Sequence, residues 1–242
     1  MTGRLRALWR LLALQATWNF ERMQGIGMGH AAEPLLEELK ESDAARQADA
    51  VVRSAEFFNC HPYLAGVALG ATVRAEYEGV PGAQIVRLRT ALCGPLGALG
   101  DRLFWIGVVP LMMSAAALAV VEGAGLAVIL ALLVVYNALR LATGVWSLEA
   151  GLRAGIRVSG EIAGSWLTRA AERVGPAAGF MVGLAIPKVA ASLLAGAGAP
   201  MVGGALVLAI AGVMLATRFG SAISPVRLGL VAILLTLIYA GR

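Results

Sequence analysis

Two long runs without a charged side chain constrain this sequence more than any other feature. No Asp, Glu, Lys or Arg occurs from Leu103 to Val121, and after a Glu-Gly turn a second such run extends from Ala124 to Leu139. Crossing the hydrocarbon core of a bilayer takes about 20 helical residues, so both runs can span with help from their flanks. The chain is only 14% charged, against about 25% in ordinary soluble domains, and its mean hydropathy is +0.77. An integral membrane protein is indicated.

The distribution of Lys and Arg predicts how the chain is oriented in the membrane. We expect spans at about 103–121, 124–142, 176–195, 203–217 and 228–241. Eleven Lys and Arg lie in 1–102, four in 143–175 and two in 218–227, whereas the turns between the other span ends hold none. These spans put all three basic regions on one side, which the positive-inside rule makes the cytoplasm. The sequence therefore predicts a multi-pass membrane protein with a cytoplasmic N-terminus. Arg10 and the residues after it argue against a cleaved signal peptide.

Several apolar segments are short or marked by Gly and Pro, namely 57–73, 90–102, 176–195 and 228–241. Gly/Pro-interrupted segments in a membrane protein indicate a transporter's binding region. The predicted fold class is all-α, a polytopic membrane protein with broken or re-entrant helical segments and an N-terminal amphipathic helical region. We divide it into residues 1–102 and 103–242, with an amphipathic interlude at 143–175, and treat both as one integrated membrane unit.

The polar stretch QATWNFERMQGIGMGH, residues 15–30, is unusual beside so much apolar sequence. As a helix it would form two neighbouring stripes, one of Thr17, Glu21, Gln24 and Met28 and one of Gln15, Asn19 and Arg22. Amide, carboxylate and guanidinium groups would then converge beside the aromatic rings of Trp18 and Phe20, a mixture that suits a sugar. The alternative is an interfacial helix with a solvated polar face.

Three further polar residues stand out. Asn59 and His61 precede Pro62, and His61 is either a ligand or a satisfied structural histidine. Asp101 directly precedes the first long span, where an ionisable group is a functional candidate, or a helix N-cap for residues 102–121. Two histidines and two separated cysteines give no metal-ligand spacing, so no metal or other cofactor is expected. The net charge of +5 comes without a basic, aromatic-interleaved stripe, so no nucleic acid is expected.

Three motifs in this order, QATWNFERMQGIGMGHAAEPLL, EFFNCHPYLAGVALG and GPLGALGDRLFW, resemble the IID subunit of the mannose/fructose/sorbose family of the bacterial phosphotransferase system. The resemblance implies a membrane subunit that is not itself an enzyme. It would pair with a IIC subunit in a larger oligomer, and cytoplasmic IIA and IIB proteins would relay phosphate to a hexose-type sugar as it enters.

Carried onto this chain, the resemblance implies two groups of residues. Substrate-binding or IIC-facing positions are Gln15, Trp18, Asn19, Glu21, Gln24, Asn59 and His61. Arg22 and Asp101 are expected to hold the geometry of the site. An intramembrane aspartyl protease is excluded, because it needs two facing carboxylates and Asp43 and Asp49 lie in the polar N-terminal region, away from Asp101. A non-transporting structural or receptor-like subunit remains the alternative.

Overall fold

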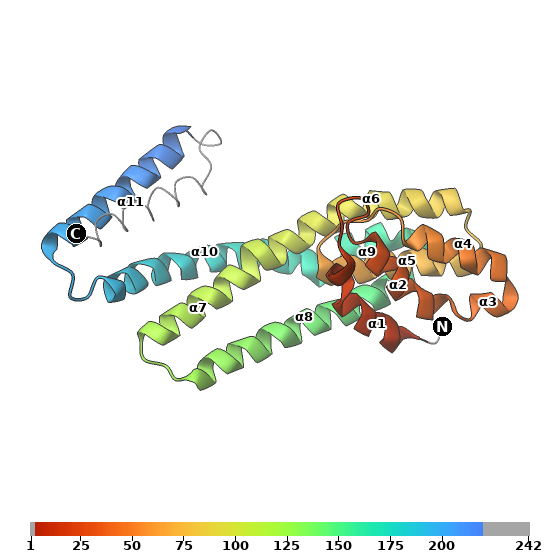
Figure 1. Ribbon diagram of the computed structural model, residues 1–242, viewed down its shortest axis with the longest axis horizontal. Coiled ribbons are helices and arrows are strands. Elements are labelled where there is room, and N and C mark those ends of the chain that lie inside the picture. Colours follow the sequence, from red (N-terminus) through yellow and green to blue (C-terminus); the bar gives the residue numbers. More distant parts are fainter. Residues whose placement is uncertain (1–2, 220–242) are drawn as a thin grey trace. The chain divides into compact units, whose positions relative to one another are not determined.

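The structure is a computed structural model that describes residues 3–219, and these residues form helices and no strand (Figure 1). The all-α prediction is thereby confirmed for them. The chain divides into two compact units, Met1–Lys188 and Val189–Arg242. The elements are α1 (Arg4–Leu12), η1 (Leu14–Thr17), α2 (Gly25–Leu36), α3 (Leu39–Ser42), α4 (Ala44–Ser54), η2 (Pro62–Leu64), α5 (Ala65–Tyr77), α6 (Gly82–Gly100), η3 (Asp101–Val108), α7 (Val109–Val121), α8 (Leu126–Ala154), η4 (Gly155–Arg157), α9 (Val158–Ala163), α10 (Trp166–Leu193) and α11 (Ala199–Phe219).

Helix α5 forms the centre of the first unit and is buried along almost its whole length. Its first nine residues, AGVALGATV, are small or apolar on every side, which suits a helix surrounded by others. Its principal neighbour is α8, and α2, α4 and α6 also pack against it. A Cβ at Gly66 or Gly70 would overlap α8, and one at Gly151 would overlap the α5 backbone. These glycines let the two helix backbones approach closely.

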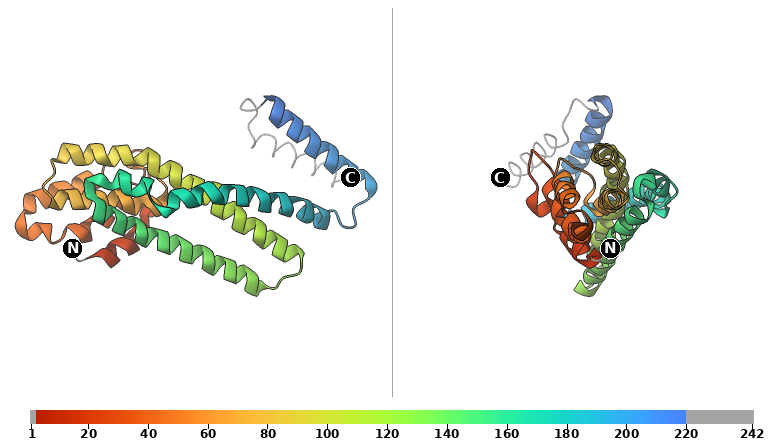
Figure 2. Two further views of the ribbon diagram at one scale, coloured as in Figure 1. Left: turned by 180° about the vertical axis from the view of Figure 1, so that it is seen from behind. Right: turned by 90° about the vertical axis from the view of Figure 1, so that its right-hand side faces the viewer.

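A single helical run continues from Gly82 to Val121 through α6, η3 and α7 (Figure 2). The break expected at 90–102 is therefore not present, although Pro95 lies inside α6. Its middle part, η3, is a π-helix in which the Val109 N–H bonds to the Phe104 carbonyl, five residues earlier. The wider turn lies directly before Pro110, which cannot donate a backbone hydrogen bond. Because the helix begins at Gly82, the expected N-cap role of Asp101 is wrong.

A second helical run, from Leu126 to Leu193, is also long and apolar enough to cross a membrane. Its first part, α8, continues without interruption from the expected span at 124–142 into the interlude at 143–175. That interlude is not one amphipathic helix, because η4 and α9 interrupt the run before α10 begins at Trp166. The break expected at 176–195 is absent as far as Leu193, where α10 ends. The expected span at 228–241 lies outside the described residues.

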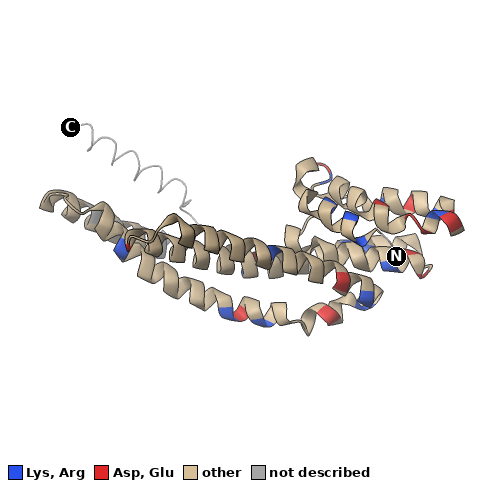
Figure 3. Cartoon of the chain, turned by 90° about the horizontal axis from the view of Figure 1, so that it is seen from below, with Lys and Arg blue, Asp and Glu red and all other residues tan. Residues whose placement is uncertain are grey.

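Charged side chains are concentrated on α1–α4 and at the ends of the long helices, whereas α7 and the first half of α8 carry none (Figure 3). The exposed side chains of those two stretches are instead large and apolar, among them Met113, Val120, Leu130 and Val134. Contiguous apolar surface of this kind requires lipid or a protein partner around it.

The stretch at 15–30 is not one helix, and the stripes considered for it do not form. After η1 the backbone turns extended at Trp18, and α2 begins only at Gly25. Between them the Asn19 side-chain oxygen accepts hydrogen bonds from the backbone N–H groups of Glu21, at 3.1 Å, and Arg22, at 2.8 Å. Such a local side-chain bond competes with helix formation. Met23 then takes a left-handed backbone conformation, with φ of 53°.

This turn is fixed to the second motif by a buried glutamine. The Gln24 amide donates to the Cys60 carbonyl at 2.8 Å and accepts from the Cys60 N–H at 3.1 Å. The Gln24 N–H also donates to the Phe58 carbonyl. The side chain of Gln24 thus pairs with a backbone as a neighbouring β-strand would, and it connects two segments 36 residues apart.

A buried carboxylate joins α4 to the end of α5. Glu76 is 3% exposed, and it accepts two hydrogen bonds of 3.0 Å from Arg53 and lies 3.0 Å from a guanidinium nitrogen of Arg46. Two arginines around one desolvated carboxylate make removal of the acid costly, since their positive charges lose their counterion.

We expect Glu76→Gln to lower the free energy of unfolding of the purified chain by about 3–5 kcal/mol, as found when one partner of a buried ion pair is removed. The measurement is thermal unfolding in detergent. Glu78→Gln is the matched control, because Glu78 and its partner Arg74 are exposed and such pairs contribute about 0.3–0.5 kcal/mol. Equal melting temperatures for both variants would contradict the buried ion pairs of Glu76.

Gln24→Ala is expected to destabilise the junction of the two motifs. The substitution leaves the Cys60 N–H and carbonyl without partners, at about 1–3 kcal/mol for each buried group. Limited proteolysis at residues 18–24 and the melting temperature both report the effect. Gln84→Ala, at an exposed position of α6, should change neither measurement.

Candidate functional site

The third motif reaches the second one through a glycine. A Cβ at Gly100 would overlap the His61 ring, so only glycine lets this ring lie against the helix. His61 then stacks on Phe104, with ring centroids 5.1 Å apart and planes at 15°. The Tyr63 ring meets Phe104 edge-on at 4.8 Å. The three rings form a rigid aromatic cluster at the start of η3.

His61 is neutral in this cluster. Burial lowers the pKa of its imidazole to about 4, because the charged form would lose its hydration. Its Nδ1 accepts a hydrogen bond from the Tyr63 N–H at 3.3 Å, which assigns the proton to Nε2. Nε2 is buried and has no hydrogen-bond partner among the described residues. His61 therefore presents one unused donor.

An open hollow of about 560 Å³ lies where the three motifs meet, and we call it the polar hollow. It is bounded by the end of η1, the segment before α5 and the junction of α6 with η3. Its lining residues include Gln15, Gln24, Asn59, Cys60, His61, Pro62, Cys93, Asp101 and Trp105. Burial raises the pKa of the Cys60 thiol, which keeps it protonated.

The structure brings five of the nine candidate residues to this hollow, namely Gln15, Gln24, Asn59, His61 and Asp101. They differ in their freedom to bind. Gln24 is occupied by Cys60, and His61 is buried, whereas Gln15, Asn59 and Asp101 are exposed and form no side-chain hydrogen bond within the described part of the chain.

The other four candidates do not line the hollow; they lie on the turn beside it. Trp18 and Phe20 pack edge to face at 4.9 Å, and both are exposed. The Asn19 side-chain oxygen holds the turn by accepting hydrogen bonds from the backbone N–H groups of Glu21 and Arg22. Glu21 and Arg22 are exposed at its tip, so this chain alone does not enclose them.

Sequence reasoning missed three side chains, one that lines the polar hollow and two that belong to the aromatic cluster or contact it. Trp105 lines the polar hollow from η3. Tyr63 bonds through its hydroxyl to the Tyr136 hydroxyl of α8 at 2.9 Å, and Arg140 lies over the Tyr63 ring at 5.1 Å. An arginine within an apolar run is a signal that could have identified Arg140. The two aromatic residues had no such signal.

The sequence of this chain is similar to those of known proteins. Residues 3–239 match the family described as the PTS system mannose/fructose/sorbose family IID component. The mannose-specific EIID component of Escherichia coli K12 is 30% identical over 179 residues, which is 72% of this chain and 63% of that protein. The fructose permease IID component of Bacillus subtilis is 29% identical over 180 residues, covering 72% and 65% respectively. The matched region thus spans less than two thirds of the length of these curated relatives.

Two solved structures are also similar to this chain. A chain described only as a membrane protein aligns with a TM-score of 0.65 and 28% identity, covering 76% of this chain and 69% of that one. A chain from a cryo-EM structure of the mannose transporter ManYZ in complex with microcin E492 aligns with a TM-score of 0.58 and 27% identity, with the same coverage. The resemblance seen in the three motifs is confirmed, and this chain belongs to the IID component family of the mannose/fructose/sorbose phosphotransferase systems.

Proposed function

We propose that this chain is the IID membrane subunit of a sugar permease, and that with a IIC subunit it forms the unit through which a hexose-type sugar enters the cell. The observation that carries the proposal is the polar hollow. Three motifs far apart in the sequence place amide, carboxylate and imidazole groups around one open space with an indole ring. Few, convergent polar groups beside aromatic side chains are the usual composition of a small-ligand site.

The exposed members of the hollow have the chemistry for a polyol. Asp101 accepts hydrogen bonds, and Asn59 and Gln15 both donate and accept. Each is exposed in the isolated chain, so a second subunit is needed to exclude water from the ligand. A facing IIC chain would supply that wall, and Glu21 and Arg22 on the adjacent turn would contact it.

The proposed division of labour leaves phosphoryl transfer to the IIB protein, which receives phosphate from IIA. The geometry of His61 supports this, because a neutral, buried imidazole behind a ring stack is poorly placed to accept phosphate from another protein.

The proposed location is the bacterial cytoplasmic membrane, with several spans and a cytoplasmic N-terminus. The two long apolar helical runs and their exposed apolar side chains support the membrane setting. The clustering of Lys and Arg in 1–102 and 143–175 supports the orientation. Higher oligomers would cover part of the remaining apolar surface.

Asp101→Asn is expected to reduce phosphoenolpyruvate-dependent sugar uptake at least about tenfold, since the neutral amide loses a charge-assisted acceptor worth about 1.5–3 kcal/mol. Uptake is measured in cells that carry the matching IIA, IIB and IIC proteins. Glu41→Gln, at another exposed acid that lies outside the three motifs, should transport normally.

Co-purification with IIC separates the two candidate functions. A transport role requires that Asp101→Asn still co-purify with IIC while uptake falls. If uptake and co-purification fall together, the hollow is a subunit interface and the structural or receptor-like reading is favoured. Normal uptake by Asp101→Asn would remove the hollow from the transport path.

A further inference from the structure

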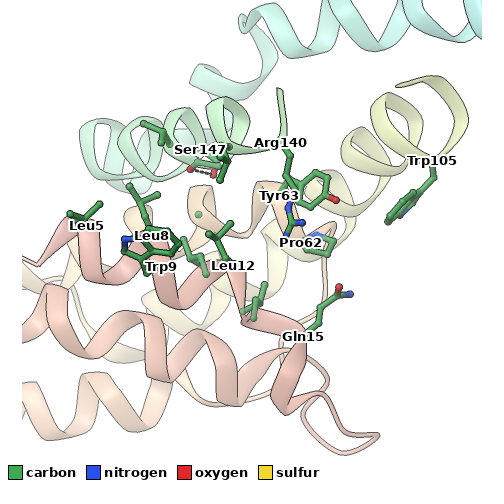
Figure 4. A pocket seen from close by; sticks show the side chains of 16 residues that line it. Leu5, Leu8, Trp9, Leu12, Gln15, Pro62, Tyr63, Trp105, Arg140 and Ser147 are labelled. Carbon is green, nitrogen blue, oxygen red and sulfur yellow. Dashed lines mark hydrogen bonds between the residues drawn. The ribbon is translucent and has the colours of Figure 1, made fainter. Parts of the chain in front are cut away.

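A second hollow lies between α1 and α8, and it is mostly apolar. It has a volume of about 380 Å³, and we call it the apolar groove. Leu5, Trp9 and Leu12 line it from α1, and Leu141 and Val145 line it from α8 (Figure 4). These five side chains are 39–68% exposed. The groove is therefore open along its side, and large apolar side chains form both of its walls.

The two groove residues of α8 belong to a longer row of exposed side chains. This row recurs every three or four residues along one side of the helix, and we call it the α8 stripe: Leu130, Val134, Asn137, Leu141 and Val145. Positions three and four apart share a helix face. The half-buried side of α8 is a different one, marked by Ile129, Leu132 and Tyr136. The α8 stripe is thus free surface as far as the groove, where α1 lies beside it.

Asn137 is the one polar member of the α8 stripe. It lies about 17 Å along the helix from Leu126, at about 1.5 Å per residue, and so inside a hydrocarbon layer of about 30 Å that begins at the α7–α8 turn. Its Nδ2 donates to the Leu133 carbonyl of its own helix at 2.8 Å, and its side-chain oxygen accepts no hydrogen bond from the described residues. Lipid tails offer this oxygen no donor. In membrane proteins such amides bond across to a neighbouring helix.

The apolar groove leads out of the hydrocarbon layer. It begins beside Arg140 and ends near Leu5 and Ser147 (Figure 4). At that end Arg4 forms an ion pair of 3.1 Å with Glu149, and both side chains are in contact with solvent. An acyl chain stays within the hydrocarbon layer, whereas a helix of another protein crosses this boundary with apolar and polar side chains in turn. The groove therefore suits a protein better than a lipid.

The apolar groove and the polar hollow are continuous. Gln15, Pro62 and Trp105 line both of them. In the proposed permease a IIC chain covers the open side of the polar hollow. A subunit seated there would continue across these three residues onto α1 and the α8 stripe. This continuity favours IIC over a second copy of the present chain as the occupant of the groove.

We propose that a transmembrane helix of the IIC subunit lies along the α8 stripe, with a polar side chain opposite Asn137 and large apolar side chains in the groove against Leu5 and Trp9. The proposal rests on the proposed function, because it takes IIC as the partner. A single polar contact within an apolar seam fixes the axial register of two helices. Trp9 and its neighbours supply the desolvated contact area that anchors an interface. The docked helix thereby holds IIC over the polar hollow.

Site-directed photocrosslinking tests where IIC docks. The photoreactive residue p-benzoylphenylalanine is placed at one position at a time in the full-length chain, which is co-expressed with its IIC protein, and the adducts formed in membranes are identified by mass spectrometry. Trp9, Val134 and Leu141 should each give an adduct with IIC. Val128 and Val135 are the matched controls, because they are exposed on another side of α8, and they should give none.

Replacement of Asn137 tests the polar contact. Asn137→Leu keeps the size of the side chain and removes the amide. The dissociation constant of the pair with IIC, measured by energy transfer between labelled subunits in liposomes, should rise about threefold to tenfold, the loss of one interhelical hydrogen bond. Asn137→Gln keeps an amide and should retain most of the affinity. Val135→Leu, on the other side of α8, should bind IIC as wild type does.

Three results would overturn the proposal. Adducts of Val134 and Leu141 that contain a second copy of this chain, or only lipid, would assign the α8 stripe to a homo-oligomer or to the bilayer. Equal adducts with IIC from Val128 and Val135 would mean contact without a specific seat. Wild-type affinity in Asn137→Leu would mean that the amide does not contact IIC.

These failures are distinguishable from failure of the proposed function. If the wild-type chain co-purifies with IIC and supports sugar uptake while the α8 stripe gives no adduct with IIC, only the docking surface is wrong. If the wild-type chain does not co-purify with IIC, the docking surface and the permease role are both rejected.

Discussion

The close approach of α5 and α8 is the constraint on which the rest of the first unit depends. Gly66, Gly70 and Gly151 leave no side chain between the two backbones, so the helices meet at a distance that larger residues would forbid. The short segment before α5 is thereby held against α8, and the polar hollow lies beside this segment.

Polar side chains in and near the motifs divide into two kinds. Gln24, Asn19 and Arg89 spend their hydrogen-bonding groups on backbone, and Arg89 alone donates to the carbonyls of Ser54, Glu56 and Phe57. Backbone that is neither helix nor strand needs such partners when it is buried. Gln15, Asn59 and Asp101 keep their groups exposed. The irregular loops are thus stabilised by one set of polar residues so that the other set can face outward together.

The sequence predicted the helical fold class and the family, because apolar run length and long motifs carry that information locally. The sequence did not predict the turn within residues 15–30, and the reason is again local. Helical spacing of polar residues looks the same whether Asn19 faces solvent or bonds the N–H groups of Glu21 and Arg22, and the left-handed Met23 has no glycine to mark it. The breaks expected in 90–102 and, as far as Leu193, in 176–195 did not occur, although Pro95 and Pro187 lie inside α6 and α10, since a helix in an apolar setting tolerates proline without ending. The positions of Trp105 and Tyr63 depend on long-range packing, which no local pattern contains.

The polar hollow has one side that this chain fixes and one side that it leaves open. Pro62 lines the hollow and belongs to the segment that the α5–α8 packing holds in place, and the His61 ring lies against Gly100, where a Cβ would overlap it. Gln15, Asn59 and Asp101 also line the hollow, but their side chains are exposed. The positions of the polar groups are therefore set within this chain, whereas exclusion of water from a ligand depends on what covers the exposed side.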